Sequence, residues 1–125
     1  MKTLLASLIL LFSISNLSAQ SEGTNLSDSV IVVNGVCGMC QKVIEKAASV
    51  HGVAEAKWNK DTKILTLKYN SEEVSIETIY KSVAASGYDT EFLAAPEEAY
   101  QSLHGCCKYR DPAIQEDHQK WLNSF

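Results

Sequence analysis

Residues 30–40 read VIVVNGVCGMC, and this stretch decides the fold. The β-branched run Val30–Val33 predicts a buried strand, and the Asn-Gly pair that follows it predicts a turn. From Met39 to Val50, apolar residues recur at spacings of three and four, which predicts a helix. We therefore expect Cys37 in the loop between strand and helix, and Cys40 in the first turn of the helix.

The residues that follow predict a second half with the same kind of elements. Val53–Trp58 and Lys63–Tyr69 flank a polar turn and predict a hairpin. Ser75 is a predicted helix N-cap, since apolar residues at helical spacing run from Ile76 to Gly87. Tyr88–Leu93 predicts a last short strand.

The predicted order is strand, helix, strand, strand, helix, strand. This order is typical of the α+β class and of the ferredoxin-like βαββαβ sandwich. We expect a four-stranded antiparallel sheet with both helices on one face, formed by a domain at residues 30–95. A C-terminal helical extension, residues 96–125, follows it, and in it Asp111-Pro112 predicts the start of a helix.

The N-terminus has the pattern of a secretory signal. Lys2 is followed by an apolar run from Leu4 to Ile14, and Ala19 offers a small residue at the expected cleavage point. We expect residues 1–19 to be removed, residues 20–29 to form a flexible leader, and the mature chain to be exported to the periplasm or secreted.

The composition excludes several classes of function. Charged residues make up 21% of the chain and the formal net charge is −4, without the basic face that a nucleic-acid binder requires. No Ser/His/Asp arrangement, glycine-rich phosphate loop or paired carboxylate set is present at a supporting spacing. We expect a monomeric protein that is not an enzyme.

Cys37 and Cys40 are the predicted metal ligands. Two intervening residues let both sulfurs approach one ion, and the start of a helix favours thiolates. Thiolates without a neighbouring carboxylate or imidazole favour soft ions, so Cu(I) is expected and Hg(II) or another soft metal is the alternative. In an exported protein the same pair could instead be a redox-active or structural disulfide. An interaction module with structural cysteines is a third reading.

The chain resembles the heavy-metal-associated domain family of copper chaperones, copper-ATPase modules and periplasmic mercury-binding proteins. The resemblance covers residues 30–94 and rests on the Cys37-Gly38-Met39-Cys40 junction, on Gly52-Val53 and on Ser86-Gly87-Tyr88-Asp89. It implies metal binding by the two cysteines and transfer to a metal-transporting membrane protein or another metallochaperone. It also implies a loop around the metal, formed by Gly35, Gly38, Met39 and Tyr88. The chain departs from the usual Gly-Met-x-Cys-x-x-Cys pattern, because Gly35-Val36-Cys37 is one residue shorter and lacks that Met.

The extension contains a second cysteine pair, Cys106 and Cys107, preceded by His104. One hypothesis is that the tail folds back and supplies additional ligands, from these thiols and this imidazole, to the first pair. The alternative is that the two cysteines form disulfides, because spacing alone does not establish proximity.

Overall fold

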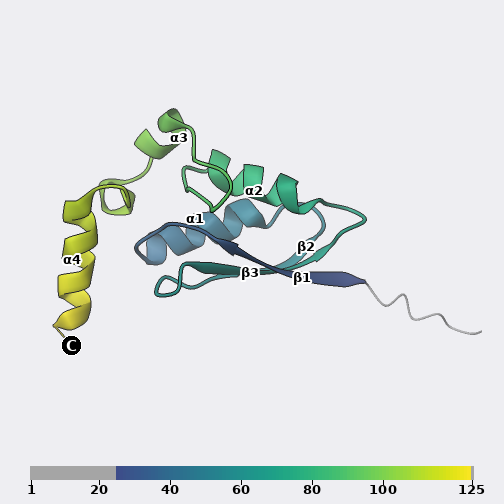
Figure 1. The fold of residues 1–125 in the computed structure, drawn as a ribbon, viewed down its shortest axis with the longest axis horizontal. Coiled ribbons are helices and arrows are strands. Elements are labelled where there is room, and N and C mark those ends of the chain that lie inside the picture. Colours follow the sequence, from purple (N-terminus) through teal and green to yellow (C-terminus); the bar gives the residue numbers. More distant parts are fainter. Residues whose placement is uncertain (1–24, 125) are drawn as a thin grey trace, which may run out of the picture.

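Figure 1 shows a computed structural model that describes residues 25–124, apart from the side chain of Leu122. The predicted signal at residues 1–19 lies outside the described residues, and the predicted leader is described only from Asn25. In the part of the chain that the structure describes, no helix has the length and apolar character needed to cross a membrane.

The sheet has three antiparallel strands in the order β1-β3-β2. Its central strand, β3, pairs with both neighbours, and Leu67 lies opposite Ser29 on one side and Ala56 on the other. The first strand begins at Leu26 rather than at the predicted Val30, because Leu26 is paired with Asn70 at the far end of β3. The strands are β1 (Leu26–Val32), β2 (Val53–Trp58) and β3 (Ile64–Asn70).

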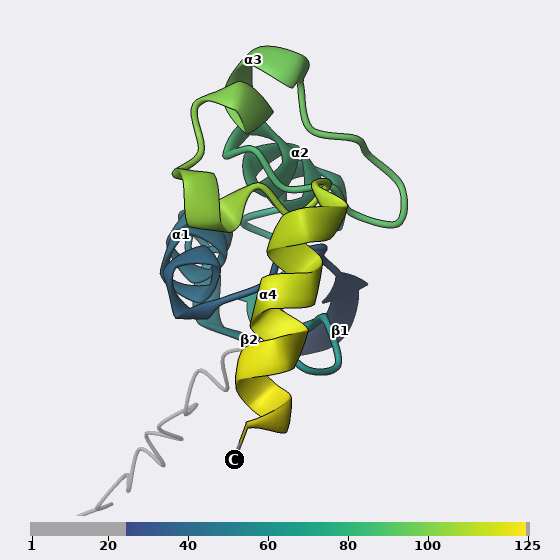
Figure 2. The ribbon, with the colours of Figure 1, turned by 90° about the vertical axis from the view of Figure 1, so that its left-hand side faces the viewer.

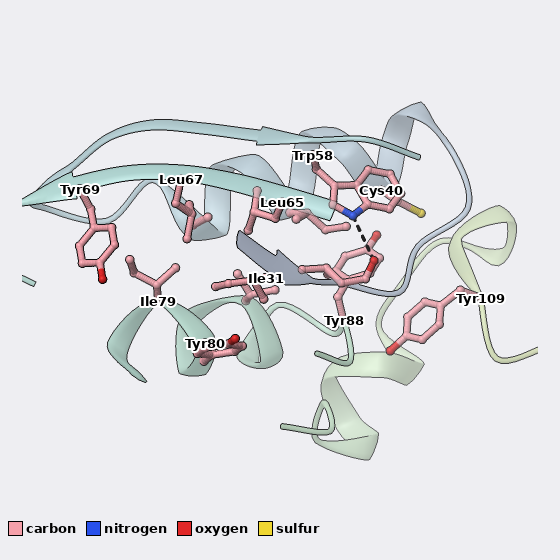
Figure 3. Packing of buried hydrophobic residues seen from close by; sticks show 14 of the residues in the cluster. Ile31, Cys40, Trp58, Leu65, Leu67, Tyr69, Ile79, Tyr80, Tyr88 and Tyr109 are labelled. Carbon is pink, nitrogen blue, oxygen red and sulfur yellow. Dashed lines mark hydrogen bonds between the residues drawn. The ribbon is translucent and has the colours of Figure 1, made fainter. Parts of the chain in front are cut away.

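Two helices, α1 (Gly38–Ala48) and α2 (Ile76–Ala85), cover one face of this sheet (Figure 1). The Ser75 side chain accepts a hydrogen bond from the Thr78 backbone N–H, so the predicted N-cap of α2 is confirmed. The helices and the sheet enclose one apolar core (Figure 3). Its fully buried side chains include Ile31, Ile44, Leu65, Leu67, Ile79 and Val83.

The predicted fourth strand is wrong for the described residues. The segment 88–93 lies along the free edge of β1, but it pairs there only through the bridge between Val33 and Thr90. The Thr90 backbone N–H donates to the Leu93 carbonyl at 2.8 Å, which turns the chain back on itself. The Glu91 carboxylate accepts the Val32 N–H at 2.8 Å, so a side chain satisfies the β1 edge where a backbone carbonyl would otherwise do so.

The C-terminal extension is helical, as expected. It contains α3 (Glu97–Gln101), a short 3₁₀ helix η1 (Gly105–Cys107) and α4 (Pro112–Asn123). The Asp111 carboxylate accepts the Ala113 backbone N–H at 2.9 Å, which confirms the predicted start of α4. Figure 2 shows α4 at the end of the molecule where α1 begins.

Candidate metal site

The two predicted ligands lie at the start of α1. Cys37 is the N-cap residue with extended backbone, and Cys40 follows in the first turn, as the sequence predicted. The Cys40 side chain is buried, whereas Cys37 is half-buried at the edge of a groove. Their Sγ atoms are 3.5 Å apart. The turn of the helix therefore holds both sulfurs on the same side.

A third thiol reaches this pair from the extension. The Cys107 Sγ lies 3.8 Å from the Cys37 Sγ, and the sulfurs of Cys37, Cys40 and Cys107 all lie within 4.8 Å of one another. We call these three side chains the thiol cluster. Burial raises the pKa of the Cys107 thiol, and negative charge on Cys40 and then on Cys37 raises it further. The positive charge of a bound cation would offset the repulsion between the thiolates of the cluster.

Tyr109 fixes the position of Cys107. Its ring stacks on Tyr88 at a centroid distance of 5.5 Å and meets the edge of Tyr100 at 5.3 Å. Its hydroxyl donates to the Gly87 carbonyl and accepts the Asp89 backbone N–H, both at 2.9 Å. The tail is therefore anchored to the loop after α2 by both packing and hydrogen bonds.

Gly87 permits this close approach of the tail. Its φ is +108°, a conformation that glycine adopts without strain. A Cβ atom at this position would lie 2.9 Å from the Ala99 carbonyl oxygen and 2.9 Å from the Leu103 side chain.

Arg110 forms a second connection between tail and loop. Its guanidinium contacts both carboxylate oxygens of Asp89, at 3.0 and 2.7 Å, and lies 4.2 Å from the centroid of the Tyr100 ring. This hydrogen-bonded cation holds the pKa of Asp89 below its ordinary value. The Asp89–Arg110 ion pair is partly exposed, and its guanidinium packs on the Tyr100 ring.

Tyr88 lies inside the site. Its side chain is fully buried, and Figure 3 shows it between Cys40 and Tyr109. The hydroxyl makes no hydrogen bond of standard geometry within residues 25–124. Burial raises the pKa of Tyr88, and the neighbouring sulfurs of Cys40 and Cys107 raise it further. The phenol therefore stays protonated, as a donor beside the thiol cluster.

Of the predicted loop glycines, only Gly35 is required by close packing. A Cβ atom there would lie 2.9 Å from the Trp58 ring and 3.2 Å from the Cys40 Cβ. At Gly38 the same atom would meet nothing within 4 Å. The Trp58 indole N–H donates to the Val33 carbonyl at 3.0 Å, and this hydrogen bond holds the ring against the loop at Gly35.

Lys63 is a site residue that the sequence did not indicate. It ends the β2–β3 turn with a φ of 62°, and its ammonium donates to the Gly35 carbonyl. Burial lowers the pKa of Lys63, while negative charge on Cys40 opposes this shift. The sequence position of Lys63 does not predict that it lies near the cysteines, because only the pairing of β3 with β1 brings the β2–β3 turn close to the loop that contains Gly35.

The other predicted ligands lie outside the thiol cluster. The exposed Cys106 has its Sγ 3.9 Å from the Cys107 Sγ and 3.7 Å from the Met39 Sδ. His104 is exposed and borders a small hollow that Met39 and Cys107 also line. Of the tail residues predicted as possible ligands, only Cys107 joins Cys37 and Cys40.

No known protein family matches this sequence, and no curated protein does. Among solved structures, the chain is similar to a CopZ metallochaperone, with 26% identity and a TM-score of 0.50. That similarity covers 51% of this chain and 98% of the other. About half of this chain therefore has no counterpart in the metallochaperone.

Two further structures are similar to the chain. One is a putative copper-ion-binding protein from Bacillus anthracis str. Ames, with 23% identity, a TM-score of 0.52, and coverage of 54% of this chain and 99% of the other. The second is oxidized MerP from Ralstonia metallidurans CH34, with 19% identity, a TM-score of 0.45, and coverage of 52% and 96%.

Proposed function

We propose that this chain, whose fold is similar to that of a CopZ metallochaperone, binds a soft metal ion, Cu(I), outside the cytoplasm and passes it on by thiolate exchange. The thiol cluster carries this proposal. Its ligands are all sulfur, and thiolates select soft ions such as Cu(I). Hg(II) or another soft ion is the alternative cargo, since the same preference applies to it.

The sulfur spacing allows one ion to bond to all three thiolates. With a metal–thiolate bond of about 2.3 Å, a linear site separates its sulfurs by about 4.6 Å and a trigonal site by about 4 Å. The Cys37 sulfur lies 3.5 Å from Cys40 and 3.8 Å from Cys107, closer to the trigonal value. We therefore assign Cys107 as a third ligand beside the predicted pair.

Accessibility gives the three ligands different roles. Cys40 and Cys107 are buried, whereas Cys37 faces the groove between its loop and α4. A partner's thiolate can reach the ion on the Cys37 side and bond to it before Cys37 leaves. Two resident sulfurs hold the ion during this exchange. A metal-transporting membrane protein or another metallochaperone with exposed cysteines fits as the partner.

Titration of the reduced mature protein with Cu(I) against a competing chelator tests the proposal. Cys37→Ser/Cys40→Ser should abolish tight binding, and Cys107→Ser should weaken it about tenfold or more, or at least ~1.4 kcal/mol. His104→Gln is the matched control and should bind as the unchanged protein does.

Binding no tighter than that of free thiols would overturn the proposal. An insulin-reduction assay on the same sample then examines the alternative, since steady turnover identifies a thiol–disulfide protein. Equal affinity of Cys107→Ser and the unchanged protein would leave a two-thiolate site and remove the tail from it.

A further inference from the structure

We propose that Met39, Cys106 and Cys107 form a second soft-ion position at the surface, which shares the Cys107 sulfur with the thiol cluster. This inference rests on the proposed function, because it extends the same sulfur site. It assigns a role to two residues, Met39 and Cys106, that the three-thiol site leaves unused.

The observation behind it is a continuous row of five sulfurs. The row runs from Met39 Sδ to Cys106 Sγ at 3.7 Å and then to Cys107 Sγ at 3.9 Å. It continues to Cys37 Sγ at 3.8 Å and ends at Cys40 Sγ after 3.5 Å. Each of the outer two spacings is below the separation of about 4.6 Å that one ion with two bonds of about 2.3 Å can span.

Different elements supply these donors. Met39 belongs to the first turn of α1, whereas Cys106 and Cys107 belong to η1, which the tyrosine packing holds against the domain. Met39 and Cys107 also line one small surface hollow. The placement is therefore a product of the tail's docking and not of proximity along the chain.

Exposure separates the two positions. Met39 is 45% exposed and Cys106 is exposed, whereas the thiol cluster is largely buried. A thioether and a thiolate are both soft ligands, so an ion arriving from solvent meets this pair first. Cys107 touches both positions, and an ion can pass inward when its bond to Cys106 is replaced by one to Cys37.

The chemistry balances without any redox step. Each thiol that binds an ion releases one proton to solvent, and the Met39 thioether binds through a lone pair without releasing one. The Cys107 thiolate can bridge two ions, because sulfur has more than one lone pair. The fully loaded protein then holds two Cu(I) ions on four thiolates and one thioether.

The test counts Cu(I) ions bound by the full mature chain, reduced and under anaerobic conditions, with a chelator that competes for the weaker ion. The unchanged protein should bind two ions. Met39→Leu and Cys106→Ser should each weaken the second ion about tenfold or more and leave the affinity for the first within about twofold. His104→Gln, at the rim of the same hollow, is the matched control and should bind two.

Metal–metal scattering in X-ray absorption of the two-ion form is a second readout, expected because Cys107 bridges the ions. Saturation of the unchanged protein at one ion would overturn this inference and leave the proposed function standing. Full second-ion affinity in Met39→Leu would leave only Cys106 and the shared Cys107 at this position and would also overturn the inference. Failure to bind even one ion tightly would count against the proposed function itself.

Discussion

At the scale of single residues, the buried Tyr88 hydroxyl is a hydrogen-bond donor placed next to the sulfurs of the thiol cluster. A buried hydroxyl without a hydrogen bond costs about 1–3 kcal/mol of folding free energy. Tyr88 places this hydroxyl beside Cys40 and Cys107 and stays protonated there. Its natural acceptor is a thiolate, which forms when the thiol cluster binds a metal ion.

Tyr88→Phe should therefore have opposite effects on the metal-free and metal-bound protein. Thermal unfolding of the metal-free variant should occur at the same temperature or higher, because an unsatisfied polar group is removed. Its Cu(I) affinity should fall about tenfold, the loss of a ~1.5 kcal/mol hydrogen bond to a charged sulfur. Tyr100→Phe, in the same aromatic packing, is the control and should retain affinity. Undiminished affinity in Tyr88→Phe would show that the phenol does not donate to the bound thiolates.

At the scale of elements, residues 88–93 after α2 form only one bridge to the sheet and bind the C-terminal tail through Asp89. Asp89 is central to this contact, since its carboxylate accepts the Ala95 backbone N–H at 2.7 Å as well as the Arg110 guanidinium. Residues 88–93 therefore contact both the sheet and the tail, through the Val33–Thr90 bridge and the Asp89–Arg110 pair.

The Asp89–Arg110 pair should make stability depend on pH in the acid range. The pKa of Asp89 is depressed below 3.8 in the folded protein, so its contribution is present above 3.8 and is lost as the pH falls through the folded pKa. Asp89→Asn should lower the free energy of unfolding at pH 7 by about 1 kcal/mol, since the pair is partly exposed. It should also flatten the decline of stability below about pH 3.8.

Chemical denaturation at several pH values measures both effects. Glu116→Gln, an exposed carboxylate of α4, is the control and should leave the curve unchanged. A decline in acid as steep in Asp89→Asn as in the unchanged protein would assign the acid sensitivity to other carboxylates.

At the scale of the whole molecule, the thiol cluster joins two parts of the chain. Cys37 and Cys107 are 70 positions apart in sequence, and their sulfurs are 3.8 Å apart. A ligand that binds only the folded form stabilises the contacts that assemble its site. Metal binding should therefore stabilise the docking of the tail on the domain.

Hydrogen exchange measures this coupling directly. One equivalent of Cu(I) should slow exchange of the backbone amides in residues 105–110, because opening of the tail then requires loss of a metal bond. In Cys107→Ser the same residues should exchange at the metal-free rate, while α1 remains protected. Equal protection of the tail in both proteins would show that its docking is independent of the metal.

Local signals in the sequence determined most of the elements. The polar turn between two apolar runs predicted β2 with its observed bounds, and alternation predicted β3 within one residue at each end. Ser75 and Asp111 predicted the starts of α2 and α4, because a capping side chain acts on backbone groups two or three residues away. The Cys37–Cys40 pair was located for the same reason, since one helical turn sets its geometry.

Contacts between distant residues were decided only by the tertiary structure. Adjacent cysteines are equivalent by spacing, yet η1 turns Cys107 into the core and leaves Cys106 exposed. The run 88–93 has strand composition, but Asp89 bonds to the tail and Thr90 turns the chain, so pairing with β1 stops at one bridge. The sequence alone determined what depends on neighbours within one turn or one strand, whereas the third thiol and the sheet edge depend on where the tail docks.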